Sequence, residues 1–102
     1  MTEHAVIVKY QLSGDGFGSE QERQEVRRME TQLRTAIDQA GVGEFDGDEF
    51  GGGAVTIYTY GPDADALFAA AKDALRGLPL RPAVAVLRYG EGVDAQEVHV
   101  NL

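Results

Sequence analysis

The sequence contains no cysteine, which excludes disulfide bonds, thiolate chemistry and metal sites built on cysteine. It also lacks any apolar run close to the roughly 20 residues that a membrane-spanning helix requires. Its amino-terminal residues do not show the basic segment followed by an apolar segment that marks a secretory signal. These absences predict a protein that resides in the cytoplasm and does not insert into a membrane.

Basic residues are scarce. Nine Lys and Arg accompany 17 Asp and Glu, so the formal net charge is -8. A surface of this sign disfavours binding to nucleic-acid phosphates and to anionic membranes. It suits a basic protein partner or a metal ion, although the same charge also serves solubility alone.

What is present is typical of one globular domain. The chain has 102 residues, of which 43% are hydrophobic and 25% are charged. This length and composition are enough for a single hydrophobic core. We therefore expect one domain over residues 1–102, with no linker and no internal repeat.

Two segments have the pattern of amphipathic helices. The first begins at Ser19, which forms a capping-box pattern with Glu22, and Gly41 is suited to its carboxyl end. The second begins around Pro62 and Asp63, residue types that favour a first helical turn, and it ends near Gly77. The apolar stripes that support the two helices are Val26, Met29, Leu33, Ala36, Ile37 and Ala40, and Ala64, Leu67, Phe68, Ala71, Ala74, Leu75 and Leu78.

Five further segments predict strands. Residues 4–12, 54–60 and 83–89 are rich in β-branched and aromatic residues, and residues 97–102 alternate polar and apolar side chains. Residues 42–50 form a weaker strand because two glycines interrupt it, and the glycines that follow supply a hairpin turn. The order is β-α-β-β-α-β with one additional strand. It predicts an α+β, ferredoxin-like fold, with an antiparallel sheet, two helices on one face and an extra edge strand at the carboxyl end.

The short motifs do not indicate catalysis. The loop at residues 14–18 has the spacing G-x-G-x-G and lacks the lysine of a phosphate-binding loop, so it is interpreted as a turn. Neither Ser13 nor Ser19 lies in the context of a catalytic nucleophile, and the two histidines, His4 and His99, are near opposite ends of the chain. We expect no catalytic activity and no cofactor.

The acidic residues of the weak strand allow two interpretations. Glu44, Asp46, Asp48 and Glu49 could offer oxygen ligands to Ca²⁺ or Mg²⁺, and Asp46 and Asp48 would share a strand face if no bulge intervenes. The pattern fits no established metal-binding loop, so no metal is predicted. The other interpretation is an exposed edge strand whose charges deter pairing with other chains. The acids stay candidates for contact with a partner.

Tyrosines are the strongest candidates for a binding surface. Tyr58 and Tyr60 share one face of their strand, and if the helices cover the opposite face, both lie on the open face of the sheet. Tyr10 is grouped with them. Such a face can bind a protein, associate with a second copy or line a small-molecule pocket. The alternative is that these rings pack beneath a loop or the last strand.

The central motifs resemble those of a set of short, uncharacterised bacterial proteins. The resemblance rests on GEFDGDE at residues 43–49 and YTYGPDADALF at residues 58–68, and it covers about the central half of the chain. It implies a ferredoxin-like domain without an assigned activity. A more distant similarity, in pattern only, is to the RNase E inhibitor protein B group, whose acidic domains act by binding a protein.

Together, these features predict a small, non-catalytic binding or regulatory protein of the cytoplasm. Its partner is a protein or a second copy, bound through the open sheet face, and residues Tyr10, Tyr58, Tyr60, Glu44, Asp46 and Asp48 are the candidates for contact. Two alternatives stay open. One is an acidic inhibitor of a basic protein, of the immunity-protein or antitoxin type. The other is a dimeric ferredoxin-like barrel that acts as an enzyme or binds a small ligand.

Overall fold

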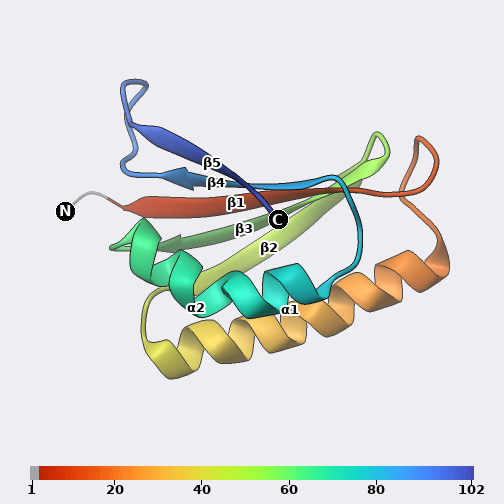
Figure 1. The fold of residues 1–102 in the computed structure, drawn as a ribbon, viewed down its shortest axis with the longest axis horizontal. Helices are drawn as coiled ribbons and strands as arrows, with labels where there is room; N and C mark the ends of the chain where they lie inside the picture. The colour runs from red at the N-terminus through yellow and green to blue at the C-terminus, as the bar shows by residue number, and fades with distance from the viewer. Residues whose placement is uncertain (1–2) are drawn as a thin grey trace.

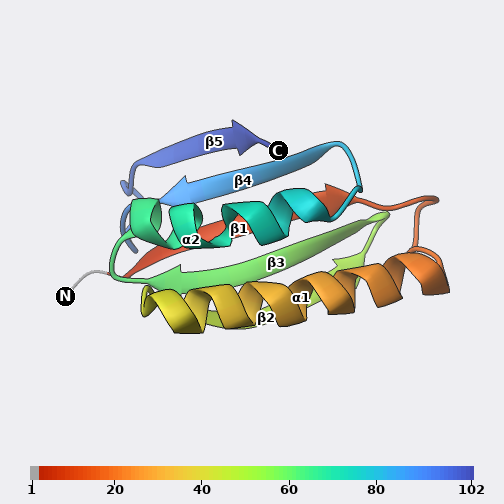
Figure 2. The same cartoon turned by 60° about the horizontal axis from the view of Figure 1, so that its bottom comes forward.

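The structure is a computed structural model that describes residues 3–102. Two helices pack against one face of a single five-stranded sheet (Figures 1 and 2). The elements follow one another as β1 (His4–Gln11), α1 (Glu20–Ala40), β2 (Glu44–Gly51), β3 (Ala54–Gly61), α2 (Ala64–Gly77), β4 (Ala83–Arg88) and β5 (Glu97–Asn101). This is the predicted ferredoxin-like α+β fold, and the prediction is confirmed.

The sheet is antiparallel throughout, in the order β2-β3-β1-β4-β5. β1 is therefore the middle strand, and β2 and β5 are the two edges. β5 is the extra strand beyond the four of the basic fold, and it pairs with β4. Figure 2 shows that the two helices lie over β1 to β4 and that β5 extends beyond them.

Helix α1 begins where its sequence predicts. The Ser19 hydroxyl accepts a hydrogen bond from the backbone N–H of Glu22 at 3.1 Å, and the Glu22 carboxylate accepts from the N–H of Ser19 at 2.8 Å. These two bonds form a complete capping box. The helix ends at Gly41, whose φ of 65° is in the left-handed region that glycine adopts without steric cost.

Helix α2 begins one residue later than its sequence predicts. Asp63 is the N-cap, and its carboxylate accepts from the backbone N–H groups of Asp65 and Ala66. Pro62 therefore lies before the cap and not in the first turn. The reason is that a side-chain oxygen on Asp63 satisfies two free N–H groups, which a proline cannot do.

The core lies between the helices and one face of the sheet. That face carries Val6, Val8 and Tyr10 of β1, all fully buried. The other contributors come from both helices, from the neighbouring strands and from the segments that follow β1 and α2: Leu12, Val26, Met29, Leu33, Ile37, Val55, Ile57, Ala64, Leu67, Ala71, Leu75, Leu78, Ala83, Ala85 and Leu87. In the part of the chain that the structure describes, no helix is both long enough and apolar enough to cross a membrane.

Candidate functional site

The opposite face of the sheet is not covered by a helix. On β3, Val55 and Ile57 point into the core, whereas Tyr58 and Tyr60 are half-buried and lie on the open face. Ile7 of β1 is directly opposite Tyr58, and on its other side it is opposite Val86 of β4. The centre of the open face is thus a row of three apolar side chains from three adjacent strands.

Tyr10 does not belong to this surface. Its ring lies on the covered face with no exposed area, and its hydroxyl donates a hydrogen bond of 2.6 Å to the carbonyl oxygen of Leu75 in α2. Burial raises the pKa of Tyr10 well above its usual range, and the charge of Arg81 opposes this only in part. Tyr10 therefore ties α2 to the sheet and is separated from Tyr58 and Tyr60, which lie on the open face.

The acidic strand β2 is divided by a β-bulge between Phe45 and Gly47. Before the bulge, Glu44 is opposite Tyr60 on the open face; after it, Asp48 is opposite Ile57, on the side of the helices. Asp46 is the extra residue of the bulge. Because a bulge shifts the alternation of side chains by one residue, Asp46 and Asp48 do not share a face.

Asp46 and Asp48 consequently have different neighbours. Burial first, and then the charge of Asp46, raise the pKa of Tyr60, so Asp46 lies near that hydroxyl. Asp48 faces Glu30 of α1, whose pKa rises to about 8 through burial, a hydrogen bond with Asp48 and the charge of Asp48. Among residues 3–102, no three carboxylate or imidazole groups lie close enough to hold a metal ion together.

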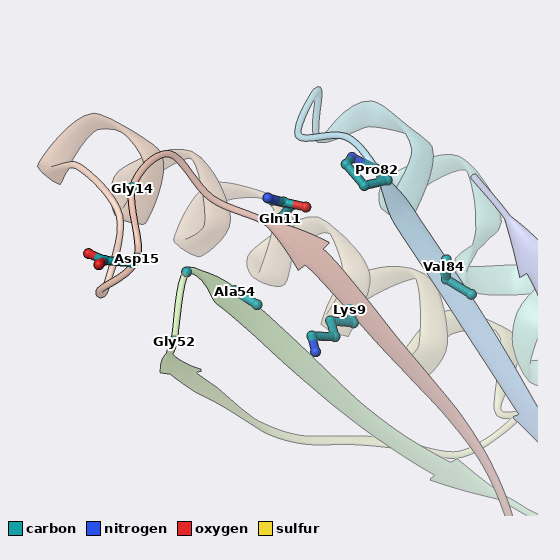
Figure 3. A pocket seen from close by; sticks show the side chains of 9 residues that line it. Lys9, Gln11, Gly14, Asp15, Gly52, Ala54, Pro82 and Val84 are labelled. Atoms are coloured by element: carbon teal, nitrogen blue, oxygen red, sulfur yellow. The ribbon is translucent and has the colours of Figure 1, made fainter.

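Two shallow hollows lie on the open face, at opposite ends of β1. The larger, of about 460 Å³, is at the end of β1 near the glycine loops, and Figure 3 shows Lys9 and Gln11 from β1 with Val84 and Pro82 on one side of it. The smaller, of about 260 Å³, lies between Tyr60 and Arg88 at the other end. Both hollows are open to solvent, unlike the enclosed clefts that bury most of a small ligand.

Arg88 is fixed in place beside the smaller hollow. Its guanidinium donates hydrogen bonds to three backbone carbonyl groups of the β4–β5 loop, those of Gly90 at 3.1 Å, Glu91 at 3.2 Å and Gly92 at 2.6 Å. These bonds fix the side chain beside the hollow, where its positive charge adds to that of Lys9 on the same face. The sequence does not reveal this, since the loop carbonyls come to Arg88 only when the chain folds.

The serines and histidines have structural contacts. Ser13 donates from its hydroxyl to Glu22 at 2.8 Å, and Ser19 caps α1. His4 accepts a hydrogen bond at Nδ1 from the backbone N–H of Ala64 at the start of α2, at 3.0 Å. His99 lies 3.6 Å from Glu97 on β5. Ser13 and Ser19 thus meet at Glu22, and each histidine lies at a place of its own.

Comparisons with known proteins add no relative: the chain matches no family model, no curated protein and no solved structure. The resemblance of the central motifs to short bacterial proteins, and the more distant one to the RNase E inhibitor protein B group, therefore stay predictions. The function of the chain has to be inferred from the geometry of its open face.

Proposed function

We propose that this protein is a small, non-catalytic binding protein of the cytoplasm, and that its contact surface is the open face of the sheet. The observation that carries the proposal is the row of Ile7, Tyr58 and Val86 with Tyr60 beside it, all half-buried and none covered by a helix. Apolar side chains gathered on one face of a sheet are rarely left in water without a partner. Tyrosines add both apolar area and a hydroxyl that can bond across an interface.

A site-specific photo-cross-linking experiment tests this. A photoreactive phenylalanine analogue replaces Tyr58 in one variant and Gln24, an exposed residue of α1 on the other side of the molecule, in a second variant. We expect covalent adducts from position 58 and none from position 24 in cells that produce the protein. Equal adducts from both positions, or none from either, would contradict a contact surface on the open face.

A second candidate is inhibition of a basic protein. It is favoured by the charged side chains of β2, where Glu44, Asp46, Asp48 and Glu49 are all exposed, and by the net charge of -8. Complementary charge accelerates association and makes it sensitive to salt. If an adduct from position 58 contains a basic protein, its binding should weaken steeply between about 50 and 300 mM salt. Binding that does not respond to salt would exclude this candidate.

A further inference from the structure

The two edge strands of the sheet differ in how well they resist pairing with another chain. β2 carries four carboxylates, a glycine at its centre and a bulge, all of which deter such pairing. β5 is regular along β4 and carries a single carboxylate, that of Glu97. Its Val98, on the side of the helices, is 41% exposed, because neither helix approaches β5, the outermost element on its side (Figure 2). β5 is therefore the edge that is open to a further strand.

The hydrogen bonds between β4 and β5 show which backbone groups of β5 are free. Residues of even number bond to β4, as in the bond of 3.0 Å from the N–H of Leu102 to the carbonyl oxygen of Ala83. In an antiparallel pair, the residues between them point their N–H and C=O groups the other way. These are Glu97, His99 and Asn101, and within residues 3–102 no group bonds to their backbone on that side. They form a row of donors and acceptors that a second strand can use.

We propose that β5 pairs with β5 of a second copy of this chain, antiparallel, so that two five-stranded sheets join into one. The two-fold axis passes through the sheet at His99, which lies opposite His99 of the other copy. Glu97 then lies opposite Asn101 of the other copy, and Val98 lies opposite Val100. The helices of both copies are on the same side of the joined sheet, and both open faces stay uncovered. This inference goes beyond the proposed function, because it concerns an edge of the sheet and leaves the open face to its own partner.

The free backbone groups select this register. With the axis at His99, all three outward-pointing residues of each copy donate and accept a hydrogen bond. In the neighbouring register on the loop side, Asn101 would have to pair with Ala95, whose N–H already bonds to the carbonyl of Gly92 at 3.0 Å. In the neighbouring register on the other side, Glu97 passes beyond Asn101, the last residue of the strand. Both alternatives therefore lose a pair of bonded residues.

The side chains complement one another in the same register. On the side of the helices, the exposed Val98 of each copy packs against the half-buried Val100 of the other, and such β-branched pairs are favourable. On the open side, Glu97 lies between Arg88 of its own chain and the uncharged Asn101 of the other copy. Each His99 has its own Glu97, at 3.6 Å, on one side and Glu97 of the other copy diagonally on the other. No carboxylate faces a carboxylate, whereas two β2 strands paired in this way would bring acids together.

Sedimentation equilibrium tests the association. Only five residues of each copy pair, so the contact is smaller than a standard interface and we expect a dissociation constant on the order of 100 µM. At about 500 µM, most of the protein should then have twice the chain mass of 11.0 kDa. His99→Pro removes the outward N–H and spares the bonds to β4, so it should weaken association at least about tenfold. His99→Ala keeps that N–H and is the matched control, with an affinity within about threefold of wild type.

Introduced cysteines test the register, because the chain has none of its own. Val98 and Val100 of the other copy form a pair whose Cα atoms are about 4.5 Å apart, within reach of a disulfide. A mixture of Val98→Cys and Val100→Cys should therefore link at least about ten times faster than either variant alone, since the self pairs are more than about 7 Å apart. Gln24→Cys, on the exposed side of α1, gives the background rate of linking by collision.

Four results would overturn the proposal: a wild-type monomer at about 500 µM, a folded His99→Pro variant that associates like wild type, a cysteine mixture that links no faster than Gln24→Cys, or rapid linking of Val98→Cys with itself. Circular dichroism checks folding, and if His99→Pro does not fold, the linking rates decide. The photo-cross-linking at position 58 is independent of these measurements. An adduct there with a different protein supports the open face as a contact surface in a monomer and in a dimer alike, so the two proposals fail separately.

Discussion

Replacement of Glu30 by glutamine should stabilise the protein, and increasingly so as the pH rises. Glu30 is on α1 and faces Asp48 on β2, and its Oε2 atom is buried without a hydrogen-bond partner. Burial, followed by the contact with Asp48, raises the pKa of Glu30 from 4.5 to about 8, although Arg27 and Arg34 oppose the shift. At neutral pH the folded protein therefore holds Glu30 in its protonated form.

Proton linkage gives the sign of the effect. Between pH 4.5 and pH 8 the folded state retains a proton that the unfolded state has released. Stability therefore falls as the pH rises through this range, by at most about 1.4 kcal/mol per pH unit. Without screening, the loss of stability between pH 4.5 and pH 8 would be roughly 5 kcal/mol. Glu30 is only half-buried, however. Screening by solvent reduces the expected total to about 2 kcal/mol.

Glutamine has nearly the same shape and cannot ionise, and its amide can donate a hydrogen bond to Asp48. The free energy of unfolding of Glu30→Gln minus that of wild type should be near zero at pH 4.5 and reach about 2 kcal/mol above pH 8. Urea denaturation followed by circular dichroism across this range measures the difference. Glu25→Gln, on the same helix but beside α2, controls for the loss of a negative charge and should change stability by less than about 0.5 kcal/mol at pH 8.

A difference between Glu30→Gln and wild type that is the same at every pH would refute the reasoning. So would a carboxyl resonance of Glu30 that titrates near 4.5 in an NMR experiment, because burial opposite Asp48 would then have no effect on its pKa. Asp48→Asn gives an independent check. It should reduce the pH dependence, because it removes the negative charge that faces Glu30 and supplies a hydrogen-bond donor.

Two further changes test the fold. Tyr10→Phe removes the hydrogen bond to the Leu75 carbonyl and should cost about 1–2 kcal/mol in chemical denaturation; a cost below about 0.3 kcal/mol would mean that this bond contributes little. Gly43→Ala should cost at least about 3 kcal/mol, since φ is 152° and the new Cβ would collide with the Tyr60 carbonyl oxygen. Gly77→Ala is its control, because nothing lies within 4 Å of the new methyl group, and it should stabilise by up to about 1 kcal/mol. Similar thermal melting of the two glycine variants would contradict the steric argument.

The helices could be predicted almost completely from sequence, because their signals are local. The stripe from Val26 to Ile37 repeats every three or four residues, Ser19 and Glu22 provide the start of α1, and Gly41 provides its end. The succession of strands along the chain could be predicted for the same reason, and the observed strand bounds differ from the predicted ones by one or two residues. The ferredoxin-like arrangement is then expected, since few other topologies bury two helical stripes on one antiparallel sheet.

The candidate site could be predicted only in part. Alternation alone groups Tyr58 with Tyr60, and it does so correctly, because successive side chains on a strand point to opposite faces. It does not group them with Tyr10, which lies on another strand and turns out to be buried against Leu75. Which face the helices cover depends on how both stripes pack, and a single strand carries no information on that.

For the acidic strand β2, too, some features could be predicted from the sequence and others could not. Its charge and its glycines predict an exposed, irregular edge, and the structure has β2 at the edge of the sheet with a bulge between Phe45 and Gly47. The position of the bulge depends on how β2 pairs with β3, which the sequence of β2 alone does not determine. It separates Asp46 from Asp48, leaving one near Tyr60 and the other against Glu30.

By itself, the sequence determined the helices, the strands, their order and an acidic surface without cysteine chemistry, because these depend on composition and on spacing within one segment. Only the tertiary structure decided that Tyr58 and Tyr60 lie on the open face, that Tyr10 is a core residue and that Glu30 meets Asp48. Each of these is a contact between segments far apart in the chain. Such contacts are fixed by strand register and by the packing of helices on the sheet, and neither has a local signature.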